Sequence, residues 1–326
     1  VLAVPHISLG AELTPDHHDR TRVFAGRMLF EIAGILLAAG GLFLLERAAD
    51  ARATAAEIAV PAAIVTAALV LFSSARLREP QEHQGRGGRS AASALRDVGR
   101  NPHARLLIAV FFLETFGFTA MITTMPYATE YLLEMRGMAS ILIACALGMM
   151  LRTVPLWIAL SKRIGKRNVW LCTQLLRSVA FGVMLFSPAG AQLPILFGVV
   201  AIGAAFGAGS MIGPSIKADV IDWDEASTGE RKEGTYFALW NFATKSGAAV
   251  AVAMAGLALQ WAGFRANVEQ TPEVASAIRA LFAGLPCLFY GVAAVLVLRY
   301  RLDESEHRAL RIAIASRRAP EKPSSP

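Results

Sequence analysis

The sequence predicts an all-α membrane protein, a polytopic bundle of about eight transmembrane helices. Hydrophobic residues make up 55% of the 326 residues and charged residues only 17%, whereas charged residues are about a quarter of a typical soluble domain. The mean hydropathy is +0.47. The apolar residues also fall in runs of about twenty, the length of a helix that crosses a bilayer. This composition excludes a disordered chain and disfavours a water-soluble globule.

The apolar runs follow one another along the chain, with polar or turn-forming residues between them. The predicted spans are 28–45, 57–75, 106–129, 139–160, 169–187, 194–216, 235–261 and 281–298. Residues 1–9 resemble the end of one preceding span. The short polar segments between most spans are typical of hairpin connections between antiparallel helices.

Lysine and arginine residues lie mainly in alternate connections. In chain order, the connections on one side hold 3, 7, 4, 3 and 7 of them, and those on the other side hold 2, 1, 0 and 2. Three more, Arg152, Arg177 and Lys245, lie inside spans. The positive-inside rule places the first side in the cytoplasm. We therefore expect an integral protein of a bacterial inner membrane with both chain ends in the cytoplasm.

The residue types of enzymes, metal sites and nucleic-acid interfaces do not occur in the required patterns. The net charge of +7 is explained by the loop asymmetry, since no aromatic-interleaved basic face or finger motif occurs. Cys145, Cys172 and Cys287 lie singly inside apolar runs, which indicates neither disulfides nor a metal site. Adjacent His17 and His18 cannot ligate one ion as an i, i+4 pair would. We expect no catalytic residue, no metal and no resident cofactor.

The longest polar segment, 76–105, divides the chain. The predicted parts are the remainder of a first helical bundle (1–78), a cytoplasmic central loop (79–104), a six-helix bundle (105–302) and a cytoplasmic tail (303–326). If the loop joins two bundles of equal size, as in transporters built from repeats, about four spans are missing from the front. Val1 is then not the biological start.

Lys245 is the strongest single candidate for a functional residue. It lies inside the span 235–261, about 16 Å from the start of that span at 1.5 Å per residue. A cation left in hydrocarbon costs on the order of 3 kcal/mol, and a lysine can reach water over only part of that distance. Lys245 is therefore expected to face a wet cavity or a carboxylate. Asn241, one turn earlier on the same face, favours a binding site over the alternative, a structural salt bridge.

Arg27, Glu31 and Glu114 are further charges in or beside spans. Arg27 and Glu31 are one helical turn apart and can pair, although a cytoplasmic anchor is an equal alternative for Arg27. Glu114 has no basic partner at helical spacing, so it is protonated or pairs with another helix. A pair with Arg152 or Arg177, at similar depth on the next two spans, is the favoured interpretation. The alternative, more specific hypothesis is that Glu31 or Glu114 carries a proton or binds the coupled ion during transport.

Two pairs of glycines at four-residue spacing lie in the span 194–216: Gly203 with Gly207, and, closer to its end, Gly209 with Gly213. Such pairs let a neighbouring helix approach closely. They do not form a phosphate-binding loop, because no strand precedes them and no Lys-Ser or Lys-Thr directly follows.

The segment 217–233 is predicted to be a cytoplasmic loop with six acidic residues against three basic ones. Asp219 and Asp222, at i, i+3 near a span end, share one helix face. They can pair with arginines from another bundle, and such pairs would break and re-form if the bundles rock.

At this segment the chain resembles a known family. Residues 218–225 (Ala-Asp-Val-Ile-Asp-Trp-Asp-Glu), residues 228–236 (Thr-Gly-Glu-Arg-Lys-Glu-Gly-Thr-Tyr) and Lys245 resemble the region around the tenth and eleventh helices of the glycoside-pentoside-hexuronide cation symporters, the melibiose permease group of the major facilitator superfamily. Residues 12–27 resemble the loop after helix four of that family, 161–167 the basic loop of the superfamily, and 267–270 with 300–302 its last two segments. The resemblance covers essentially the whole chain.

The resemblance implies a major facilitator-type fold of two six-helix bundles, of which this chain would hold the end of helix four through helix twelve. It implies transport of a sugar or related solute with sodium, lithium or a proton by alternating access. Arg27 matches the helix-five arginine of the sugar site, Lys245 the helix-eleven lysine near the sugar and cation sites, and Asn241 a polar position of that region. Arg20, Asp219, Asp222 and Arg231 match the cytoplasmic charged network that holds the outward-facing state closed.

The chain departs from the family at two positions, with Ala3 in place of an acidic sugar ligand and Ile7 in place of a tryptophan. The aspartates that bind the coupling cation in the family would precede Val1. The leading hypothesis is a sugar:cation symporter whose partners are a small solute, a coupling cation and the bilayer. The alternative is a non-transporting membrane remnant or scaffold.

Overall fold

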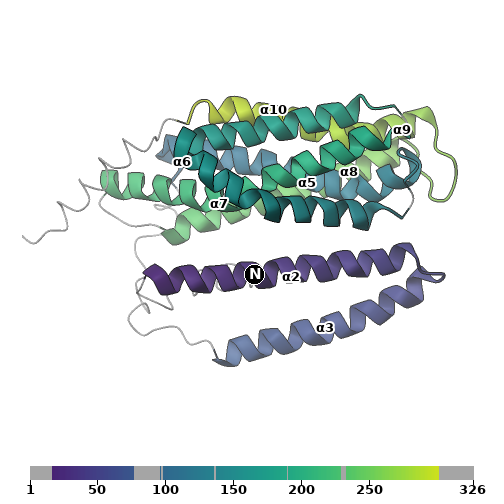
Figure 1. Ribbon diagram of the computed structural model, residues 1–326, viewed down its shortest axis with the longest axis horizontal. Helices are drawn as coiled ribbons and strands as arrows, with labels where there is room; N and C mark the ends of the chain where they lie inside the picture. The colour runs from purple at the N-terminus through teal and green to yellow at the C-terminus, as the bar shows by residue number, and fades with distance from the viewer. Residues whose placement is uncertain are drawn as a thin grey trace, which may run out of the picture. The chain divides into compact units, whose positions relative to one another are not determined.

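The computed structural model describes residues 17–76, 96, 98–135, 137–188, 190–228 and 233–300, without the side chains of 17–29, 31, 32, 210 and 211. These residues form helices and short connections and contain no strand, which confirms the predicted all-α class (Figure 1). The helices are α2 (His17–Glu46), α3 (Ala51–Arg76), α5 (Pro102–Tyr131), α6 (Ala139–Leu185), α7 (Gln192–Thr228), α8 (Glu233–Trp261), α9 (Pro272–Arg279), the π-helix η2 (Ala280–Gly284) and α10 (Leu285–Val297).

Six stretches of continuous helix in the described part are long and apolar enough to cross a membrane, and a shorter apolar stretch, Ala33–Glu46, lies in α2. α6 has 47 residues and breaks at Gly165, where φ is 80°. A left-handed φ is available to glycine without the steric cost that other residues meet. α6 therefore contains two predicted spans, 139–160 and 169–187. The expected end of a preceding helix lies outside the described residues.

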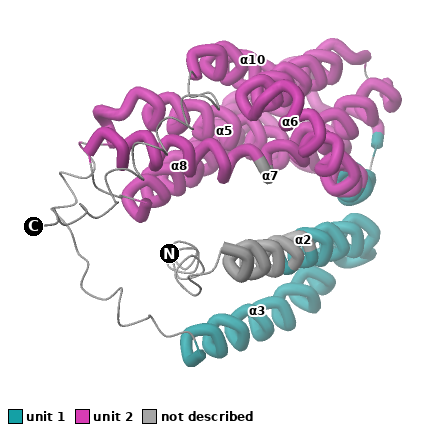
Figure 2. The backbone as a smooth tube through the Cα atoms, turned by 60° about the vertical axis from the view of Figure 1, so that its left-hand side comes forward, with its two compact units in different colours: residues 1–89, 135–144 teal, residues 90–134, 145–326 magenta. Residues whose placement is uncertain are grey.

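The chain forms two compact units, residues 1–89 with 135–144 and residues 90–134 with 145–326 (Figure 2). Unit 1 contains the hairpin of α2 and α3. Asp50 is the N-cap of α3, since its carboxylate accepts hydrogen bonds from the N–H groups of Arg52 (2.9 Å) and Ala53 (3.1 Å). No residue of α3 is buried. Exposed apolar side chains over a whole helix are expected where lipid or other protein covers it.

Unit 1 also contains the first turn of α6, which is held by α2. The Glu46 carboxylate accepts hydrogen bonds from the backbone N–H of Ser140 (3.2 Å) and from its hydroxyl (2.5 Å). A carboxylate at this place satisfies a free N–H of the helix start and interacts favourably with the helix dipole. Glu46 is thus an N-terminal cap supplied from a different helix.

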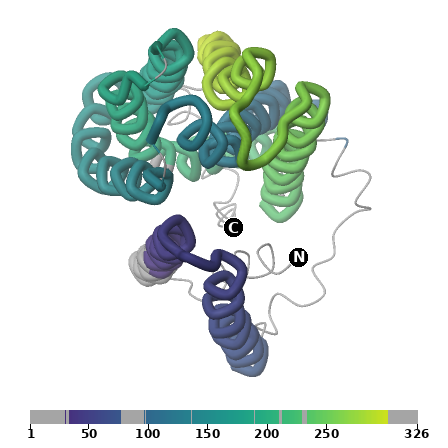
Figure 3. Tube along the Cα trace, turned by 90° about the vertical axis from the view of Figure 1, so that its right-hand side faces the viewer, coloured from purple at the N-terminus to yellow at the C-terminus, as the bar shows by residue number. Residues whose placement is uncertain are grey.

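The core of unit 2 is built around α5, which packs against α8 and α10 (Figure 3). Its main hydrophobic cluster includes the buried aromatic residues Trp170, Tyr236, Trp240 and Tyr300. Asn101 caps α5 through its side-chain oxygen and donates its amide hydrogen to the Tyr236 hydroxyl at 2.8 Å. This contact ties the starts of α5 and α8 together.

The first predicted glycine pair is a helix contact. A Cβ added at Gly203 would lie 2.3 Å from the Ala146 carbonyl oxygen, and one at Gly207 would lie 2.6 Å from that of Met150. α7 therefore approaches the backbone of α6 as closely as the sequence predicted. The second pair makes no such contact in the described part, since a Cβ at Gly209 would first meet the Arg177 side chain at 3.2 Å.

The predicted loop 217–233 is wrong over most of its length, because α7 continues to Thr228. Ile216, Val220 and Ile221 are buried in the unit 2 core. Their helical spacing stabilises three further turns beyond the predicted span end, despite the acidic residues between them. Residues 229–232 lie outside the described part.

Candidate functional site

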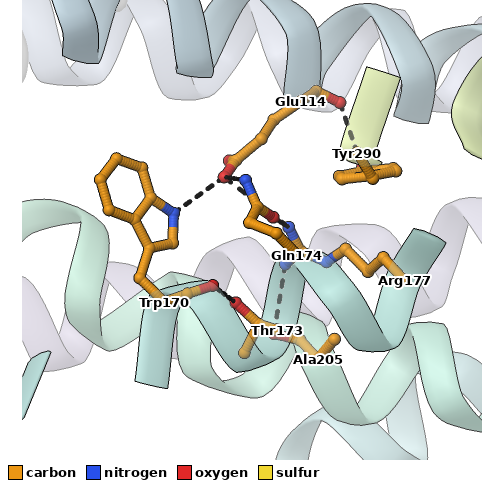
Figure 4. Close-up of polar contacts among 7 residues, drawn as sticks. All are labelled: Glu114, Trp170, Thr173, Gln174, Arg177, Ala205 and Tyr290. Atoms are coloured by element: carbon orange, nitrogen blue, oxygen red, sulfur yellow. Dashed lines mark hydrogen bonds and ion pairs between the residues drawn. The ribbon is translucent and has the colours of Figure 1, made fainter. Parts of the chain in front are cut away.

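A polar cluster lies inside unit 2 around Glu114 of α5 (Figure 4). The Glu114 Oε1 atom accepts hydrogen bonds from Trp170 Nε1 at 2.9 Å and Gln174 Nε2 at 2.5 Å, both from the second half of α6. Arg177 Nη1 lies 3.9 Å from the same oxygen. The predicted pairing of Glu114 with an arginine is confirmed, and the partner is Arg177.

Arg177 is buried and makes several polar and aromatic contacts. Its side chain is 3% exposed, and its guanidinium donates to the Gln174 side-chain oxygen and to the Ala205 carbonyl oxygen, each at 3.2 Å. The guanidinium carbon lies 4.4 Å from the Phe206 ring centre and 5.2 Å from that of Tyr290. A buried ion pair with this many supporting contacts is expected to fix helices in place. The arrangement favours the structural interpretation of Glu114, and its proton-linked role stays a prediction.

Asp219 pairs with Lys166, which follows the break of α6 at Gly165. Lys166 Nζ lies 2.9 Å from Oδ2 and 3.2 Å from Oδ1 of Asp219. The lysine side chain is 44% exposed and the Asp219 side chain 11%, so the pair contributes at most about 1 kcal/mol. This partner was not predicted, although Lys166 belongs to the basic segment that the sequence singled out.

The other predicted members of the cytoplasmic network are only partly described. Asp222 is half-buried on α7. Arg20 lies in α2 without a described side chain, and Arg231 lies outside the described residues. Arg27 and Glu31 also lie on α2, one turn apart, and their side chains are outside the described part.

Lys217 was not singled out by the sequence, which placed it at a loop start. Its Nζ atom lies 4.5 Å from the ring centre of Phe111 and 5.5 Å from that of Trp240. Such cation–π contacts stabilise a partly desolvated ammonium group. Nearby, burial and then the charge of Asp219 raise the pKa of the Tyr300 hydroxyl. Through its two ring contacts, Lys217 of α7 joins α5 and α8.

Lys245 lies on the exposed face of α8. The buried face of this helix is formed by Tyr236, Trp240, Ala243, Gly247, Ala251, Ala255 and Leu259. Lys245 points away from that face and is exposed, while Asn241, one turn earlier, is half-buried. Asn241 donates its amide hydrogen to the Phe237 carbonyl oxygen at 2.9 Å. Among the described residues, no carboxylate forms an ion pair with Lys245.

Arg152, the other arginine considered for Glu114, is also exposed. It lies on the first half of α6, beside Thr153, whose hydroxyl donates to the Ala204 carbonyl oxygen at 3.0 Å. The contact of α6 with α7 thus runs through Thr153 and leaves Arg152 outside it.

Within the described part of the chain, no group of three or more His, Cys, Asp or Glu residues could hold a metal ion.

Comparison with known proteins gives consistent matches. A family profile described as MFS/sugar transport protein matches residues 1–304. A glucuronide carrier protein homolog of Escherichia coli strain K12 is 31% identical over 168 residues, 51% of this chain and 36% of that protein. A putative sulfoquinovose importer of Salmonella typhimurium strain LT2 is 25% identical over 314 residues, 94% of this chain and 66% of that protein.

A putative glycoside/cation symporter of Escherichia coli strain K12 is 28% identical over 102 residues, 31% of this chain and 22% of that protein. Each of these matches thus covers less than two thirds of the relative's length. The relatives carry the names of transporters rather than enzymes. The matches confirm the resemblance to glycoside and cation symporters that the sequence motifs indicated.

Proposed function

Because this chain belongs to the MFS/sugar transport protein family, we propose that it acts in secondary active transport of a sugar or related small solute. Transport would proceed by alternating access and would be coupled to a cation, either sodium or a proton. The names of the relatives, which include a glucuronide carrier homolog and a glycoside/cation symporter, support a glycoside or sugar as the solute and a cation as its partner.

The observation that carries this proposal is the position of Lys245. It is an exposed cation about 18 Å along α8 from Glu233 at 1.5 Å per residue. Facing lipid there would cost on the order of 3 kcal/mol, so the lysine side chain faces water or a polar solute. We place the solute against Lys245 and Asn241 of α8.

The cytoplasmic-side charges complete the proposed mechanism. The pair of Asp219 with Lys166 is partly exposed, and so it can open at little cost. We propose that Asp219 and Asp222 exchange partners as the cytoplasmic side opens and closes, with Arg231 of the same unit among the partners.

Uptake into proteoliposomes that contain the full-length protein tests the proposal. We expect uptake driven by a sodium or a proton gradient, and a loss of at least about tenfold in Lys245→Ala, because a charge-assisted contact to the solute is removed. Arg105→Gln is the matched control, since Arg105 is exposed near the start of α5. Unchanged uptake in Lys245→Ala would refute the role of this lysine, and uptake indifferent to both gradients would refute coupling.

The orientation in the membrane is a separate proposal that topology reporters test. A reporter fused after Glu134 is expected outside the cell, and one fused after Arg167 inside, because basic connections stay in the cytoplasm. Alkaline phosphatase, active only outside, and a fluorescent protein, active only inside, give opposite signals at each position. The reverse pattern would overturn the orientation.

A further inference from the structure

α10 and the second half of α6 form an antiparallel pair of helices in unit 2. Near one end of the pair, Arg167 donates a hydrogen bond to the Leu298 carbonyl oxygen, and deeper in the pair the Ser178 hydroxyl donates to the Cys287 carbonyl oxygen at 2.9 Å. The two contacts are separated by about 16 Å along each helix, at 1.5 Å per residue. The hydrocarbon core of a bilayer is about 30 Å thick, so the stretch between the contacts spans about one leaflet.

One side of this helix pair is an exposed apolar surface. Because both helices are right-handed and run in opposite directions, the residues that directly follow the contact residues turn to the same side of the pair. Val179 follows Ser178 and is 61% exposed, and Leu288 follows Cys287 and is 58% exposed. Exposed apolar residues one and two turns away extend this surface, the α6–α10 face, which consists of Leu175, Val179, Leu288, Val292 and Val295.

Two arginines lie at the end of the α6–α10 face where α10 ends. Arg299 is exposed and directly follows Leu298, whose carbonyl oxygen accepts the hydrogen bond from Arg167. Neither α6 (Ala139–Leu185) nor α10 (Leu285–Val297) contains an aspartate or a glutamate. The dipole at the end of α10 offsets only about half of one positive charge. These two helices therefore leave a net positive charge at this end of an apolar surface.

We propose that the α6–α10 face binds one anionic phospholipid of the phosphatidylglycerol type, with its phosphate at Arg167 and Arg299 and an acyl chain along the apolar residues. An arginine offers a phosphate two parallel N–H groups, and the bond to Leu298 uses one of the five N–H groups of Arg167. A headgroup that carries its own cation, such as choline, places a like charge beside the two arginines and binds less well. The site does not depend on the proposed transport function.

Native mass spectrometry of the full-length protein in detergent tests this with dioleoylphosphatidylglycerol and dioleoylphosphatidylcholine, which share their acyl chains and differ in headgroup. We expect the first phosphatidylglycerol to bind at least about tenfold more tightly than the first phosphatidylcholine. Arg299→Gln is expected to weaken phosphatidylglycerol binding about five- to tenfold, because one cation at the phosphate is lost, and to change phosphatidylcholine binding by less than about twofold. Arg167→Lys, which keeps the charge without the parallel N–H groups, is expected to weaken phosphatidylglycerol binding by about two- to fivefold.

Arg105→Gln is the matched control. Arg105 is exposed and lies at the same end of unit 2, because the ring of His103 is 6.0 Å from that of Tyr300. This variant should change phosphatidylglycerol binding by less than about twofold. Equal binding of the two lipids to wild-type protein would overturn the site. An equal loss in Arg105→Gln and Arg299→Gln would overturn it in favour of general surface charge, and competition by glycerol 3-phosphate at equal concentration would overturn the role of the acyl chain.

Discussion

Replacement of Glu114 by alanine is expected to destabilise unit 2 by about 3–5 kcal/mol, because it leaves the Arg177 guanidinium buried without its counter-charge. Arg177 is 3% exposed and cannot turn to water. Trp170 and Gln174 would also lose their common acceptor, and an unsatisfied buried donor adds to the cost. Thermal unfolding of purified protein in detergent, followed by size-exclusion chromatography, should show a midpoint lower by roughly 5–15 °C.

The double variant Glu114→Ala/Arg177→Met distinguishes loss of charge balance from loss of packing. Removal of both partners of a buried pair is often nearly neutral, so this variant should recover part of the lost stability. Glu269→Ala is the control for removal of an exposed carboxylate, and its midpoint should stay within about 1 °C of wild type. If Glu114→Ala behaves like Glu269→Ala, the cluster does not stabilise the bundle.

Gly203→Ala and Gly148→Ala are expected to change stability in opposite directions. A Cβ at Gly203 would lie 2.3 Å from the backbone oxygen and 2.7 Å from the Cα atom of Ala146, and neither atom belongs to a flexible side chain. Separation of α6 from α7 is expected to cost about 1–3 kcal/mol. Gly148 has no heavy atom within 4 Å of such a Cβ, so alanine there should stabilise the helix by about 0.5–1 kcal/mol.

The same thermal unfolding measurement checks this second pair. The two substitutions add the same methyl group to two membrane helices, so a common effect of alanine on propensity or lipid contact would shift both midpoints alike. Opposite shifts would support the close contact of α6 with α7. A Gly203→Ala protein as stable as the Gly148→Ala protein would contradict it.

The fold class follows from the sequence because membrane helices must satisfy their own backbone hydrogen bonds within runs of about twenty apolar residues. The break at Gly165 lies within the predicted connection between two spans, whereas the helical extension of α7 to Thr228 did not follow from the sequence. Near the membrane surface, polar residues occur both in loops and in helices. There the buried spacing of Ile216 and Val220 decides the structure rather than the acidic composition.

The ionisable residues inside apolar spans were predictable from the sequence, but their partners were predictable only in part. An ionisable residue within an apolar span is conspicuous from composition alone, and Lys245, Glu114, Arg152 and Arg177 were all found in this way. Depth could not decide which arginine meets Glu114, since Arg152 and Arg177 lie at similar depth. The helix face decides it, because Arg177 turns inward between Phe206 and Tyr290 and Arg152 turns outward.

The cap that Glu46 provides for Ser140 makes the start of α6 depend on a residue of α2 that lies 94 positions earlier in the chain. A helix usually takes its N-cap from the residue just before its first turn. Changes in the residues directly before α6 can therefore leave its start intact, whereas loss of the Glu46 carboxylate exposes it.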